Sequence, residues 1–122
     1  MRNENAEQLA SKRCPPCEGK VDKLSPEQAR ERLQAFEGWR LSDDAQQIRK
    51  DWEVKHFAAG MEFLNRVAKL AEREGHHPDL HLEGYRNVSI VLWTHALGGL
   101  SQSDFILASK IDQLPVRLRK KG

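Results

Sequence analysis

The sequence predicts an α+β fold in which a four-stranded antiparallel sheet carries three helices on one face, in the order α-β-β-α-β-β-α. Three segments place apolar residues at steps of three and four, which is the spacing of one helix face. The segments between them alternate apolar and polar residues, as half-buried strands do. Because the strands arrive in pairs, we expect antiparallel neighbours with the helices packed on one side.

The first helix is expected to begin after Ser25. The run Ser25-Pro26-Glu27-Gln28 combines an N-cap serine, a proline at the first helical position and a glutamine that completes a capping box. Ala29, Leu33 and Phe36 follow at helical spacing, and Gly38 ends the helix.

The next two elements are predicted to be strands. Residues 39–41 form a short one, and Asp43-Asp44 is typical of a turn. Residues 48–54 alternate between apolar and charged side chains, so the two segments predict an antiparallel hairpin.

Residues 56–74 carry the clearest helical pattern. Gly75 is a suitable helix end, and Pro78 prevents the helix from continuing through His77. Glu72 extends the apolar row and is expected at the edge of the buried face. The row expected to face the core is Phe57, Met61, Leu64, Ala68 and Ala71.

Two more strands and a helix complete the chain. Residues 80–83 alternate, and residues 85–94 form the strongest strand pattern. On that strand Val88, Ile90 and Leu92 share one face, and Tyr85, Asn87, Ser89, Val91, Trp93 and His95 share the other. Ser101 is the expected N-cap of the last helix, with Asp104 at its third position.

We divide the chain into a flexible leader at residues 1–23, a domain at residues 24–114 and a basic tail at residues 115–122. The leader contains Cys14-Pro15-Pro16-Cys17, which we interpret as part of a flexible segment because no second Cys/His pair stands at zinc-site spacing. A redox role or a metal shared between chains is the minor alternative. The tail is expected to be solvated, with a weak partner contact as the alternative.

The charge of the chain excludes some functions. Lys and Arg number 20 against 18 Asp and Glu, a net charge of +2, so no broad field attracts nucleic acid or an anionic membrane. No apolar run is long enough to cross a bilayer, and the N-terminal residues lack an apolar signal core. We therefore expect a cytoplasmic protein without direct nucleic-acid or membrane contacts.

His76, His77 and His95, with Glu72, are the candidates for chemistry. Histidine titrates near neutral pH and can both give and take protons. These residues lie at the ends of patterned elements, so we expect the imidazoles to open onto one shared hollow, with Glu72 either tuning a histidine or merely solvating the helix end. The alternative is a set of unrelated surface histidines. A metal held by His77 and His81 is a minority interpretation, because Pro78 makes His77 extended.

The spacing Glu72-x3-His76-His77-Pro78-x6-Tyr85-x9-His95-x8-Asp104 resembles the signature of the pterin-4a-carbinolamine dehydratases. The resemblance covers residues 24–114 and includes Gly38-Trp39 and Gly99-Leu100-Ser101. Gly75 stands where some members carry a polar residue, often Asp, so the resemblance does not extend to a second carboxylate there.

The resemblance implies an enzyme that removes water from 4a-hydroxytetrahydrobiopterin to give quinonoid dihydropterin, in tetrahydrobiopterin recycling. It implies His76 and His95 as an acid–base pair, His77 as the residue that orients the pterin, and Glu72 as the anchor of the histidines. It further implies that Trp39 lines the pocket and that Asp104 binds there, holding His95 or the start of the last helix. From the residues alone, Trp39 and Trp93 either cover a flat ring or belong to the core.

The resemblance implies no metal or organic cofactor and an assembly of two or four copies, a homodimer or homotetramer. Edge strands could join sheets, and helices could bundle two dimers. The rival functions are a dimerisation cofactor, which is a protein-binding module, and a pterin-related role in molybdenum-cofactor metabolism.

Overall fold

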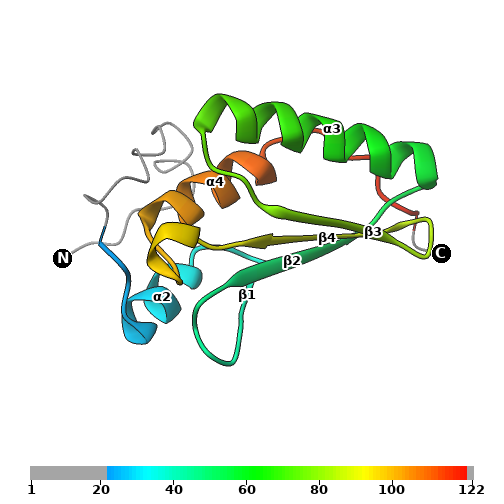
Figure 1. The fold of residues 1–122 in the computed structure, drawn as a ribbon. Helices are drawn as coiled ribbons and strands as arrows, with labels where there is room; N and C mark the ends of the chain where they lie inside the picture. The colour runs from blue at the N-terminus through cyan, green and yellow to red at the C-terminus, as the bar shows by residue number, and fades with distance from the viewer. Residues whose placement is uncertain (1–21, 121–122) are drawn as a thin grey trace.

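The computed structural model describes residues 22–120, so Cys14-Pro15-Pro16-Cys17 lies outside the described residues. It confirms the predicted fold class and order of elements, and adds a short 3-10 helix, η1. Figure 1 shows α3 and α4 lying over one face of the sheet. The elements are α2 (Pro26–Leu33), β1 (Arg40–Leu41), β2 (Ile48–Glu53), α3 (Phe57–Glu74), β3 (Asp79–Glu83), β4 (Asn87–Leu92), η1 (His95–Leu97) and α4 (Gln102–Asp112).

One hydrophobic core unites the helices and the sheet. Ala29 of α2, Phe63 of α3 and Phe105 of α4 are buried in the same cluster as the inward residues of β2 and β4. The ring of Phe36, just after α2, meets that of Phe105 edge-on with centroids 5.4 Å apart. Within the described part of the chain, no helix combines the length and the apolar character of a membrane span.

The strand order β1-β2-β4-β3 sets the position of the site. Neighbouring strands are antiparallel throughout, and in the hairpin of β3 and β4 Asp79 pairs with Val91. The beginning of β3 therefore lies beside the end of β4. Because β3 starts only a few residues after α3, the end of α3 is brought to the end of β4 as well (Figure 1).

Both predicted N-caps are confirmed. The Ser25 hydroxyl accepts a hydrogen bond from the Gln28 backbone N–H, and the Gln28 side chain accepts one from the Ser25 N–H. Ser101 and Asp104 form the same reciprocal box at the start of α4. Such boxes satisfy N–H groups that the first helical turn leaves without partners.

The last strand is shorter than predicted, because both of its ends turn. Tyr85 has a positive φ of 57° in the turn before β4, so it does not belong to the strand face. His95 begins η1 instead of extending the strand. Val88, Ile90 and Leu92 do face the core as predicted.

The prediction of which side of α3 is buried was wrong. Phe57 is 54% exposed and Met61 42% exposed, and of the predicted row only Ala71 is buried. We name Phe57, Met61, Leu64 and Ala68 the outer row. Two apolar rows lie side by side on this helix, and periodicity alone does not say which one meets the sheet. The row that faces the core is Ala59, Gly60, Phe63, Val67, Leu70 and Ala71.

The basic tail also differs from the expected solvated end. The Arg119 backbone N–H donates to the Glu53 carbonyl, and the Lys55 N–H donates to the Arg117 carbonyl. Leu118 thereby forms a bridge with Val54. The side chains of residues 117–120 stay exposed, and Val116 packs partly buried against the core. The backbone of this stretch pairs with the end of β2 and the residues just after it.

Gly75 ends α3 as predicted, in the left-handed conformation with φ of 67°. A Cβ at this position would meet no atom within 4 Å, so only the backbone conformation limits the residue. We expect Gly75→Ala to lower the free energy of unfolding by about 1 kcal/mol, and Gly75→Asn to lower it less, since asparagine tolerates this conformation better. Urea unfolding of both variants measures the difference, and equal stabilities would contradict it.

Candidate functional site

A hollow of about 250 Å³ opens where the end of α3 meets the end of β4. Its lining comes from the segment after α3 and from the segment after β4. The predicted meeting of the three imidazoles in one hollow is confirmed by this geometry. The lining residues are Gly75, His76, His77, Trp93, His95 and Ala96.

His76 is held by a buried carboxylate. Its Nε2 lies 2.7 Å from Oδ1 of Asp104, and the two residues are 4% and 0% exposed. The other Asp104 oxygen accepts from the Thr94 hydroxyl at 2.8 Å and from the Ser101 backbone N–H at 2.9 Å. Asp104 thus joins the start of α4, the end of β4 and the segment after α3.

This pairing selects the state of the His76 ring. A carboxylate only accepts hydrogen bonds, so Nε2 carries the hydrogen and the neutral ring has its basic lone pair on Nδ1. His76 is therefore oriented and kept in one tautomer.

His77 is held more weakly. Its Nε2 lies 3.3 Å from Oε1 of Glu72, and the side chains are 62% and 78% exposed. Such an exposed pair contributes little to stability but still biases the ring orientation. Glu72 points away from the core instead of lying at the edge of the buried face.

His95 differs from the other two histidines, because its partner is an aromatic ring. The indole of Trp93 lies 4.0 Å from the imidazole, centroid to centroid, with 37° between the planes. Trp93 in turn donates from Nε1 to Oδ2 of Asp79 at 3.0 Å. Asp79 was not singled out from the sequence, although its position directly after His76-His77-Pro78 was a usable signal.

Two predicted substrate contacts lie elsewhere. Trp39 does not line the hollow; it is buried in the core, and its Nε1 donates to Asp112 at 2.9 Å. Asp104 has no exposed surface and holds His76 and the start of α4, not His95. The alternative that it holds the helix start is confirmed.

No metal cluster is formed by the described residues: in the range 22–120, no three His, Cys, Asp or Glu side chains are placed to hold an ion. His81, the proposed second ligand beside His77, lies on β3 with its Nδ1 4.0 Å from Glu83.

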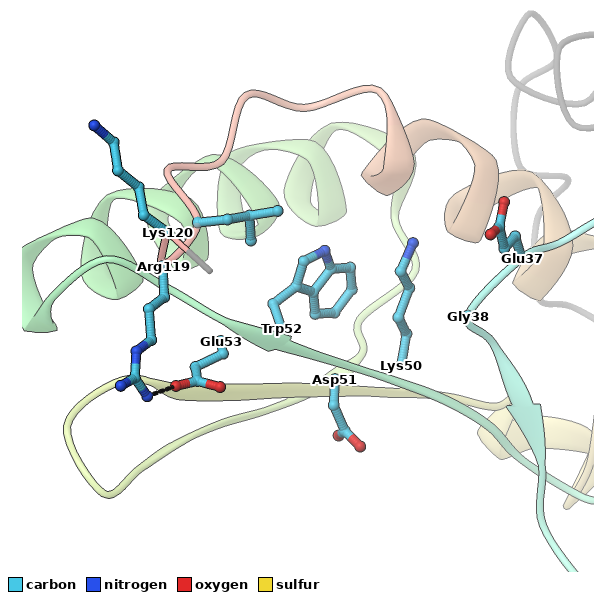
Figure 2. Close-up of a pocket in the computed structure, with 9 residues that line it drawn as sticks. Glu37, Gly38, Lys50, Asp51, Trp52, Glu53, Arg119 and Lys120 are labelled. Atoms are coloured by element: carbon cyan, nitrogen blue, oxygen red, sulfur yellow. Dashed lines mark hydrogen bonds and ion pairs between the residues drawn. The ribbon is translucent and has the colours of Figure 1, made fainter. Parts of the chain in front are cut away.

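A larger hollow of about 830 Å³ lies along the outer edge of β2, where Figure 2 shows Trp52 between Lys50 and the tail. Several of its charged residues form ion pairs: Lys50 with Asp112, and Arg119 with Glu53. Histidine is not among its lining residues, so the acid–base candidates belong to the smaller hollow. The lining residues are Glu37, Gly38, Lys50, Asp51, Trp52, Glu53, Leu118, Arg119 and Lys120.

Comparison with known proteins identifies the family. The sequence model described as pterin 4 alpha carbinolamine dehydratase matches residues 22–114. The chain belongs to the pterin 4 alpha carbinolamine dehydratase family. A relative from Arabidopsis thaliana, named pterin-4-alpha-carbinolamine dehydratase 2, mitochondrial, is 50% identical over 93% of this chain, which spans 63% of that relative's length. A putative pterin-4-alpha-carbinolamine dehydratase from Nitrosospira multiformis is 42% identical over 87% of this chain and 91% of its own length.

Solved structures of the pterin dehydratase type share the fold. A transcriptional coactivator/pterin dehydratase from Brucella melitensis superposes with a TM-score of 0.69 at 28% identity, covering 75% of this chain and 96% of its own. A pterin dehydratase-like protein described as a RuBisCO assembly factor in the alpha-carboxysome has a TM-score of 0.51 at 26% identity, covering 62% and 86%.

Replacing Asp104 by Asn tests the tautomer of His76. An amide that keeps its oxygen toward Thr94 and Ser101 turns its NH2 group toward His76 Nε2, which must then accept. We expect the ring hydrogen to move to Nδ1, measured as an exchange of the two imidazole 15N chemical shifts. Unchanged shifts would contradict the assignment.

The matched variant Asp104→Ala measures how much the hydrogen bonds of Asp104 contribute to stability, apart from the tautomer of His76. It removes the acceptor for three buried donors, and we expect the free energy of unfolding to fall by about 2 kcal/mol or more.

Proposed function

We propose that this protein is a hydro-lyase that removes water from 4a-hydroxytetrahydrobiopterin and gives quinonoid dihydropterin, as in tetrahydrobiopterin recycling. The observation that carries the proposal is the hollow that collects His76, His77 and His95, with His76 held by the buried Asp104. Family membership and the names of the relatives support the pterin as substrate.

The reaction moves two protons. The C4a–O bond breaks, the hydroxyl leaves with an added proton as water, and N5 loses its proton as the C4a=N5 double bond forms. One acid that protonates the leaving hydroxyl and one base that accepts the N5 proton are sufficient. No electron is gained or lost, so the proposed reaction needs no metal or organic cofactor.

The contacts of each histidine favour different roles. His76 is suited to act as the base, because the contact with Asp104 puts the ring hydrogen on Nε2 and makes Nδ1 the basic nitrogen. His95 is exposed, so water can reprotonate it after it donates to the leaving hydroxyl. His77, anchored by Glu72 at the rim, is placed to orient the pterin.

One rival function, a pterin-related role in molybdenum-cofactor metabolism, would use the same hollow with another substrate. A direct assay of pterin dehydration separates the two functions.

The cytoplasmic location remains a prediction, since the two Arabidopsis relatives are named mitochondrial and chloroplastic.

We also propose that the chain assembles as a homodimer or homotetramer through the outer row of α3. Phe57 and Met61, one turn apart on α3, are both exposed, and neighbouring exposed apolar side chains mark interaction surfaces where they form a patch. The partner we propose for this row is a second copy of the chain, because the same helix face from two copies can pack together about a two-fold axis. A different protein partner is the alternative, in line with the coactivator and assembly-factor titles of the two structural relatives.

The acid–base assignment is tested by turnover of carbinolamine pterin. We expect His76→Ala and His95→Ala each to slow turnover by roughly 100-fold or more, the scale of one lost acid–base group. The matched control is His81→Ala, which removes an exposed imidazole that does not line the hollow and should leave the rate unchanged. Full rates in both site variants would end the proposal.

The assembly is tested by Met61→Lys, which places a charge in the outer row. We expect the molar mass measured by light scattering after size exclusion to fall, because a buried charge opposes association. Ala58→Lys adds the same charge at an exposed position outside that row and should keep the wild-type mass. A monomeric wild-type protein would contradict self-association. A different protein partner would then be the explanation of the exposed outer row.

A further inference from the structure

Each imidazole at the hollow has a different holding contact. His76 is fixed by Asp104 and His77 by Glu72. For His95, the structure of residues 22–120 gives no hydrogen bond to the ring, and the contact it does give is the indole of Trp93. His95 is also exposed and sits on the first residue of a three-residue 3-10 helix, so its backbone restrains the ring little.

An indole can orient an imidazole only if the indole itself is fixed. Trp93 follows β4 and is only half-buried, so packing does not surround it. The hydrogen bond from its Nε1 to Asp79 restrains the indole, and hydrogen bonds to a carboxylate are stronger than those between neutral groups. Asp79 is well placed to give it, since it opens β3 and is paired in register with Val91, two residues before Trp93.

We propose that Asp79 is a positioning residue for the dehydration: it fixes the plane of Trp93, and Trp93 fixes the imidazole of His95. The indole lies tilted against one face of the imidazole. This contact restrains the direction in which the edge of the imidazole, with its two nitrogens, points. This inference rests on the proposed function of the hollow. Asp79 thus orients His95 indirectly, through Trp93, whereas Asp104 orients His76 by direct contact.

The proposal makes a specific claim about coupling. Asp79 acts only through the indole N–H, so its effect must vanish when that N–H is removed. Trp93→Phe keeps an aromatic ring beside His95 but has no N–H to donate. A double-mutant cycle on Asp79 and Trp93 therefore separates positioning from any independent structural role of Asp79.

We expect Asp79→Ala to lower kcat/KM for carbinolamine pterin about 10-fold, with most of the change in kcat, because a misdirected acid–base group slows the chemical step. Asp79→Asn keeps an acceptor for the indole and should retain most of the activity. In the Trp93→Phe background, Asp79→Ala should cause no further loss. An equal loss in both backgrounds, or no loss in the wild-type background, would overturn the proposal.

A second measurement does not depend on turnover. The Nε1–H proton resonance of Trp93, assigned by its disappearance in Trp93→Phe, should move upfield in Asp79→Ala and much less in Asp79→Asn. If wild-type protein does not dehydrate the pterin while this resonance responds as expected, the proposed function fails and the contact stands. If turnover is normal and the resonance does not respond to Asp79→Ala, the positioning proposal fails alone. Should Asp79→Ala not fold, Asp79→Leu, which is close to aspartate in size and has no acceptor, takes its place in the cycle with the same expected outcomes.

Discussion

The buried carboxylate of Asp104 is the interaction on which the rest of the site depends. It closes the capping box of α4, accepts from Thr94 at the end of β4 and binds His76 after α3. Three segments distant in sequence therefore meet at one side chain. A buried carboxylate is costly unless its oxygens are satisfied, and here the partners that satisfy it are the parts that the site must bring together. Stability of the fold and orientation of His76 have the same origin.

The second constraint is the antiparallel hairpin of β3 and β4. It returns the chain so that Asp79, close to the end of α3, lies beside the end of β4. Without this return, His95 would be a full strand length from His76 and His77. Gly75 makes the return sharp, because its left-handed backbone stops α3 directly before the first histidine.

The three histidines are held by contacts of different kinds. A buried carboxylate holds His76, an aromatic ring holds His95, and an exposed glutamate holds His77. These differences suit the proposed site, in which a fixed ring can exchange protons and an exposed residue at the rim can meet the substrate. The outer row of α3 does not line this hollow, so the proposed assembly and the proposed chemistry use different surfaces.

Much of this could be predicted from residues alone, because the signals are local. The capping boxes at Ser25 and Ser101, the end of α3 at Gly75 and the core face of β4 each depend on a few neighbouring residues. The spacing of the histidines also predicted that they would share one hollow, since antiparallel order brings the ends of neighbouring elements together.

What failed required knowledge of packing. Sequence periodicity showed that α3 is amphipathic but not which of two adjacent apolar rows meets the sheet. The family resemblance implied that Trp39 lines the pocket, but its indole donates to Asp112 in the core. The partners of Asp104 and Trp93 are likewise set by contacts between segments far apart in the chain. The sequence by itself determined the order of the predicted helices and strands, the helix caps at Ser25, Ser101 and Gly75, and the residue types available for proton transfer, because these follow from short-range backbone and side-chain preferences. Only the tertiary structure decided which carboxylate faces which ring, because that depends on how the elements pack.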